Sequence, residues 1–76
     1  MVKSTVINVL HDDYDNTATI EMAYIHPYKG ANNLAPAYIL SLTSNCDDGF
    51  MYYRGTFESM DELMDKLHTI SCDTWH

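Results

Sequence analysis

The stretch from Phe50 to Ile70, FMYYRGTFESMDELMDKLHTI, carries most of the information about the fold, because in it a strand runs directly into a helix. Residues 50–57 are mostly aromatic or β-favouring, so we expect them to form a strand. Ser59 and Glu62 have the spacing of a capping box, which predicts a helix start at this point. The apolar residues that follow have helical spacing: Met60, Leu63, Met64 and Leu67. Such a stripe must be covered, and a sheet formed by the preceding sequence can cover it.

Three earlier segments are predicted to be strands: 2–10, 17–26 and 38–43. The first is apolar on both faces, which predicts neighbours or cover on both sides, whereas the second alternates strictly and is typical of a half-buried strand. Two short acidic turns, 11–16 and 44–49, and a longer loop, Pro27–Pro36, connect the strands. Because short connections favour antiparallel neighbours, we expect an α+β fold, a four-stranded antiparallel sheet with one C-terminal helix packed on one face. Residues 71–76 are expected to be a fraying tail.

Length and charge restrict the classes of function. A chain of 76 residues predicts a single domain, 1–76. Its 11 acidic and 4 basic residues give a net charge of -7, which disfavours direct nucleic-acid binding and favours a basic protein partner. The sequence shows no signal-peptide pattern, no apolar stretch of membrane-spanning length, and two cysteines outside any CxxC motif. We therefore expect a cytoplasmic protein with reduced thiols and no membrane association.

The two acidic turns are the first candidate site. In an antiparallel meander the first and third connections lie at the same end of the sheet. Asp12, Asp13 and Asp15 would then lie near Asp47 and Asp48. Five carboxylates at one end would produce a negative field that steers a positively charged partner towards it.

Tyrosines supply the second part of the predicted site. Tyrosine is enriched at protein interfaces, and Tyr14 and Tyr28 lie in expected loops, where burial in the core is disfavoured. Tyr52 and Tyr53 point to opposite faces of one strand, so one of them can pack under the helix while the other is left for solvent or a partner. Phe50 or Tyr52 is expected on the contact surface. Trp75 either packs back on the sheet or serves as an anchor. The complete predicted partner-binding set is Asp12, Asp13, Tyr14, Asp15, Tyr28, Asp47, Asp48 and Tyr52.

Patterns that would indicate catalysis or a cofactor are weak. Exposed turn carboxylates lack the burial that tunes acid–base groups, and the three glycines form no phosphate-binding loop, so we expect neither an enzyme nor a cofactor. His68, Cys72 and His76 recur every four residues and would share a face, with Cys46 as a further ligand, if the helix continued to the C-terminus. That spacing matches no standard zinc signature, so we predict no metal site.

The general build resembles small phage-encoded inhibitor proteins, and among these it is most similar to anti-CRISPR and anti-restriction proteins. The resemblance is carried by the acidic turns and by the run Phe57–Leu63, which resembles the strand-to-helix step of such inhibitors. It implies a viral protein that acts in the host cytoplasm and blocks a nucleic-acid site on a host protein, such as a CRISPR effector or a restriction enzyme, in some cases by imitating DNA. The alternative hypothesis is a homodimeric adaptor that uses its sheet face or the edge of strand 50–57 and has no nucleic-acid-related target.

Overall fold

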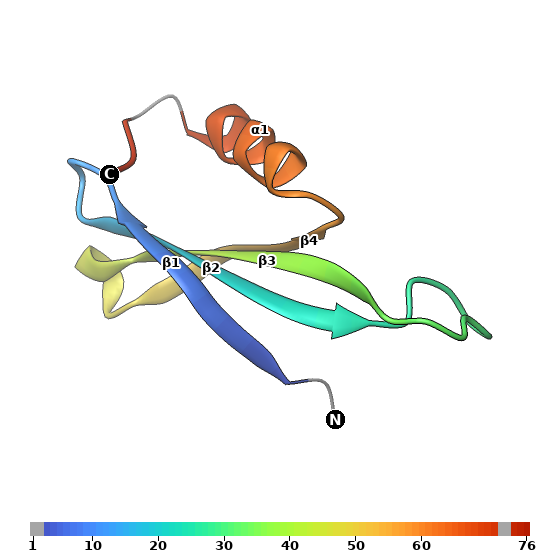
Figure 1. Ribbon diagram of the computed structural model, residues 1–76. Helices are drawn as coiled ribbons and strands as arrows, with labels where there is room; N and C mark the ends of the chain where they lie inside the picture. The colour runs from blue at the N-terminus through green and yellow to red at the C-terminus, as the bar shows by residue number, and fades with distance from the viewer. Residues whose placement is uncertain (1–2, 72–73) are drawn as a thin grey trace.

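The computed structural model describes residues 3–71 and 74–76, apart from the side chain of Asp47. Its elements are β1 (Ser4–His11), β2 (Asn16–Ile25), β3 (Ala35–Ser44), the short 3-10 helix η1 (Asn45–Asp47), β4 (Phe50–Phe57) and α1 (Met60–Ile70). The strands form one antiparallel sheet in the order β1-β2-β3-β4, and α1 lies across one face of it (Figure 1). The predicted α+β architecture is confirmed.

The core lies between α1 and the middle two strands. Leu63 and Leu67 of α1 are fully buried, as the helical spacing predicts. The sheet side is built from two cross-strand pairs, Ala18 with Leu42 and Ile20 with Leu40. Burying one such leucine or isoleucine side chain contributes about 1.5–3 kcal/mol, so these few residues supply much of the stability of so short a chain.

Local hydrogen bonds and backbone conformation determine where α1 begins and ends. The hydroxyl of Ser59 accepts a hydrogen bond from the Glu62 backbone N–H at 3.2 Å, and Asp61 and Glu62 lie at the positive end of the helix dipole. The helix ends at Ile70, where Ser71 adopts an extended conformation and its N–H bonds the carbonyl of Leu67 at 3.0 Å. The helix therefore does not continue to the C-terminus.

β1 differs from the sequence prediction. Within the described part of the chain it is an edge strand that pairs with β2 alone in the sheet, so the expectation of neighbours or cover on both sides is wrong. Val6, Ile7 and Val9 are exposed, and a register shift between Val6 and Asn8 interrupts the pairing. An apolar sequence on both faces does not distinguish a central strand from an uncovered edge.

β3 is longer than predicted, because it begins at Ala35 and includes Pro36. Its ladder with β4 starts only at Tyr38, so residues 35–37 have a β2 partner on one side and, among the described residues, no β4 partner on the other. A proline is tolerated in a strand where its missing N–H faces an unpaired side.

The described part of the C-terminal tail is docked on the sheet rather than frayed. His11 and His76 exchange two backbone hydrogen bonds, His11 N to His76 O at 2.7 Å and His76 N to His11 O at 2.8 Å. Trp75 is half-buried against the core, which settles its two predicted alternatives in favour of packing back on the sheet. The tail thus runs beside the end of β1, as Figure 1 shows near the C-terminus.

Candidate functional site: the acidic end of the sheet

The two acidic turns lie side by side at one end of the sheet, as the meander predicts. The backbone N–H of Asn45, in the second turn, donates to the carbonyl of Asp15, in the first, at 3.0 Å. The thiol of Cys46 lies 3.6 Å from a carboxylate oxygen of Asp15. Figure 1 shows both turns at the end of the molecule that also holds the C-terminus.

The backbone conformation explains why aspartate occupies positions 15 and 48. Asp15 and Asp48 have φ angles of 63° and 56°, in the left-handed region that Asp and Asn tolerate better than most residues. Gly49, with φ 77°, completes the second turn and donates its N–H to the Ser44 carbonyl at 3.0 Å. The side chains of Asp13, Asp15 and Asp48 are exposed, so the turns present their carboxylates to solvent.

Asp12 has a different role from its neighbours. The residue is only 7% exposed, and its carboxylate accepts hydrogen bonds from the backbone N–H groups of Tyr14 and Asn16 and from the Asn16 side-chain amide, at 2.8–3.0 Å. Burial raises the pKa of this carboxyl, but the hydrogen bonds from Asn16 and Tyr14 together outweigh it, so the pKa lies below its ordinary value. Asp12 therefore holds the turn in shape and offers little surface to a partner.

Exposed aromatic side chains accompany the carboxylates. Tyr14, at the tip of the first turn, is 67% exposed, and Phe50, at the start of β4, is 60% exposed. Tyr52 is exposed whereas Tyr53 packs against the core, which is the division predicted for this pair. We refer to the following residues as the acidic end: Asp13, Tyr14, Asp15, Asp48, Phe50 and Tyr52. The predicted contact residue Asp47 has its backbone at this end, and its side chain lies outside the described part of the chain.

The basic residues do not neutralise this surface. Among the described side chains, Asp13, Asp15 and Asp48 form no ion pair with Lys3, Lys29, Arg54 or Lys66. The negative charges of the acidic end are therefore available to a partner.

Tyr28 lies apart from the other predicted residues. It is 70% exposed in the loop of residues 26–34, which connects β2 to β3 at the opposite end of a molecule 43 Å long. A contact surface centred on the acidic end therefore does not include Tyr28. Tyr24 is also exposed, because it lies near this far end of β2, and the strand preference of tyrosine accounts for its presence there.

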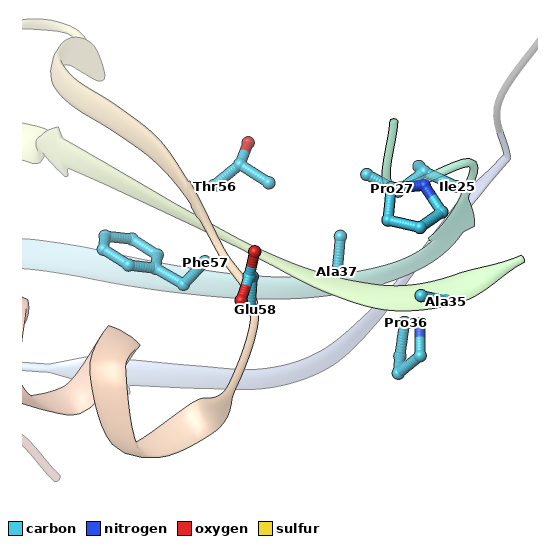
Figure 2. Close-up of a pocket in the computed structure, with 8 residues that line it drawn as sticks. All are labelled: Ile25, Pro27, Ala35, Pro36, Ala37, Thr56, Phe57 and Glu58. Carbon is cyan, nitrogen blue, oxygen red and sulfur yellow. The ribbon is translucent and has the colours of Figure 1, made fainter. Parts of the chain in front are cut away.

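A groove that no sequence pattern predicted lies at that far end. Figure 2 shows it beside residues 35–37 of β3, where β4 has ended and the chain turns towards α1. Its volume is about 520 Å³, and its lining is mainly apolar: Ile25, Pro27, Ala35, Pro36, Ala37, Thr56, Phe57 and Glu58. Glu58 is the one charged residue among these described residues, so their side chains form no acid–base pair.

The helical face that would have joined His68 to His76 on a longer helix does not form. α1 ends at Ile70, so His68 and His76 do not share a helical face, and Cys72 lies outside the described residues. Among the residues that the structure describes, no group of three or more His, Cys, Asp or Glu side chains is placed to hold a metal ion.

Comparisons with known proteins give no relative for this chain. No family model matches it, and the searches of curated proteins and of solved structures found no match. In the described ranges, 3–71 and 74–76, no helix is long and apolar enough to span a membrane.

Proposed function

We propose that this chain is a small protein-binding inhibitor of the anti-CRISPR or anti-restriction kind, and that its acidic end binds a basic, nucleic-acid-binding surface of a host protein. The observation that supports this most strongly is the placement of exposed aspartates from two separate turns at one end of the sheet, with exposed aromatic rings beside them. A surface that normally holds phosphates presents Lys and Arg side chains, and carboxylates displayed by two adjacent turns can pair with them.

In such a contact, the aromatic and the acidic side chains would make different contributions. Tyr14 and Phe50 would supply buried apolar area at the centre of the interface, where aromatic anchors contribute most of the affinity. Asp13, Asp15 and Asp48 would set the orientation and accelerate association, which are the usual contributions of complementary charge. The net charge of -7 also repels nucleic acid itself, so the partner would be the protein that binds nucleic acid.

A charge-removal variant tests the proposal without disturbing the fold. In Asp13→Asn, Asp15→Asn, Asp48→Asn, asparagine keeps the size of each side chain and tolerates the left-handed backbone at positions 15 and 48. The matched control, Glu21→Gln, Glu58→Gln, Asp65→Asn, removes the same number of charges elsewhere.

The immobilised protein is incubated with an extract of the cells in which it occurs, and retained proteins are displaced with duplex DNA. We expect the wild type and the control to retain a nucleic-acid-binding protein that DNA displaces, and the turn variant to lose it. Equal retention by the turn variant, or retention that DNA does not affect, would contradict the proposal.

The alternative, a homodimeric adaptor, is favoured by one observation. Among the described residues, β1 has no strand partner on its outer side from Ser4 to Leu10. Over this stretch Val6, Ile7 and Val9 are exposed and no side chain is charged. An edge that carries no charged side chains pairs readily with another strand. Sedimentation of the purified protein over a range of concentrations distinguishes the two functions, because the adaptor is expected to be a stable dimer before any partner is added.

A further inference from the structure

A histidine pair at the end of β1 supports an inference independent of the proposed function. His11 and His76 exchange both backbone N–H···O bonds, which is the hydrogen-bonded pair of an antiparallel ladder. In such a pair the two side chains leave the same face of the sheet, with Cβ atoms about 4.5–5.5 Å apart. The two imidazoles are therefore cross-strand neighbours, although positions 11 and 76 are far apart in the sequence.

The alternation of neighbouring residues supports this placement. Trp75 packs against the core while His76 is exposed, as expected when successive residues of an extended segment point to opposite sides. On β1, Leu10 packs against the core and His11 is exposed in the same way. Both histidines thus face the side of the sheet that α1 does not cover.

A hydrogen-bond chain holds the ring of His11. The side-chain amide of Asn45 donates to Thr17 Oγ1 at 2.9 Å, and Thr17 Oγ1 and His11 Nδ1 share a hydrogen bond at 3.4 Å. In the tautomer whose Nδ1–H donates to Thr17 Oγ1, this hydrogen bond orients the imidazole and Nε2 carries the lone pair that can bind another ligand. Histidines that bind metals are commonly held through their second ring nitrogen in this manner.

We propose that His11 and His76 together bind one divalent transition-metal ion of the kind that prefers imidazole, such as Zn²⁺. Zinc–imidazole bonds are about 2.0–2.1 Å long, and two imidazoles side by side on an exposed face can supply two of the four positions around the ion, with water in the others. The bound ion joins the tail to β1, so it stabilises the folded chain through mass action.

The test is a titration of the full-length protein with Zn²⁺, followed by the NMR signals of the histidine rings and by the thermal unfolding midpoint. We expect one ion per chain, perturbation of the His11 and His76 rings, and a higher midpoint. His11→Gln and His76→Gln should each weaken Zn²⁺ binding by at least about tenfold. Removing a residue that only hydrogen-bonds to a metal ligand commonly has an effect of this size, and removing the ligand itself should have at least the same effect.

Three controls separate this site from binding by the remaining histidines, by the thiols or by carboxylates. His26→Gln combined with His68→Gln, and Cys46→Ser combined with Cys72→Ser, should bind Zn²⁺ as the wild type does. Mg²⁺, which prefers oxygen ligands, should leave the histidine signals unchanged. Absence of Zn²⁺ binding, normal binding by either the His11 or the His76 single variant, or loss of binding in either control pair would overturn the inference.

Discussion

At the scale of single residues, the acidic turns show that the same residue type serves two purposes. Asp12 accepts three hydrogen bonds within its own turn, whereas Asp13 points to solvent. Asp12→Ala should therefore lower the free energy of unfolding by about 1–3 kcal/mol, because it leaves the donors of Tyr14 and Asn16 unpaired. Asp13→Ala is the control and should change it by less than about 0.5 kcal/mol. Urea denaturation of both variants measures the difference, and equal stability would contradict the assigned role.

The lowered pKa of Asp12 also predicts a pH dependence. Because the pKa is lower in the folded state than in the unfolded state, the ionised carboxylate stabilises the fold above pH about 3.8, its ordinary value. This contribution should be lost as the pH falls through the lower, folded-state pKa. Asp12→Asn has no group that titrates there, so its stability should fall less steeply with acidification than that of the wild type. Parallel curves for the two proteins, from acid-dependent urea denaturation, would contradict this assignment.

Gly55 is a second position where one residue constrains the structure. A Cβ atom at this position would collide with the hydroxyl and ring of Tyr53, which packs against the core. Gly55→Ala should destabilise the protein by about 1–3 kcal/mol, the usual cost of overpacking. In a Tyr53→Leu background the same substitution should cost less, since the colliding atoms are gone. A double-mutant cycle measured by thermal unfolding checks this coupling, and simple additivity would argue against it.

At the scale of the elements, the helix is held mainly by two leucines. Leu63→Ala should lower the free energy of unfolding by about 2–5 kcal/mol, because the side chain is fully buried between α1 and the sheet. Met64→Ala, one residue further along the helix and half-buried, should cost clearly less. Chemical denaturation compares the two variants, and an equal loss would contradict the claim that Leu63 contributes more to the core than Met64 does.

The strands and the helix also show which structural features can be predicted from the sequence and which cannot. The period of the apolar residues predicts α1, because burial follows from spacing within one segment, and the short connections between strands predict the antiparallel meander. Whether β1 lies at an edge depends on which strands are its neighbours, and its composition holds no information on that. The docking of the tail cannot be predicted from the sequence either, because His11 and His76 are joined by backbone hydrogen bonds, which do not depend on a particular pair of side chains.

The candidate site was predictable to a similar extent. The meander order was enough to bring the two acidic turns together, because it is a property of the topology. The burial of Asp12 depends on hydrogen bonds from Asn16 that only the folded turn creates, and the separation of Tyr28 depends on where the longer loop lies. The groove beside residues 35–37 arises because β3 extends beyond β4, a difference in strand length that the predicted boundaries did not contain.

At the scale of the whole molecule, the sheet separates two unlike ends. Exposed carboxylates and aromatic rings occupy the end with the two short turns, and an apolar groove occupies the other. A contact made through charge at the first end must weaken as salt screens it, whereas a contact made through the groove should not.

Binding by charge at the acidic end is therefore tested best by the salt dependence of affinity for the retained host protein, measured for the wild type and for the variant Asp13→Asn, Asp15→Asn, Asp48→Asn. We expect wild-type affinity to fall as salt rises, and the variant to bind more weakly and with a shallower dependence on salt. Wild-type binding that is indifferent to salt, or an unchanged slope in the variant, would show that the aspartates of the two turns do not make the contact.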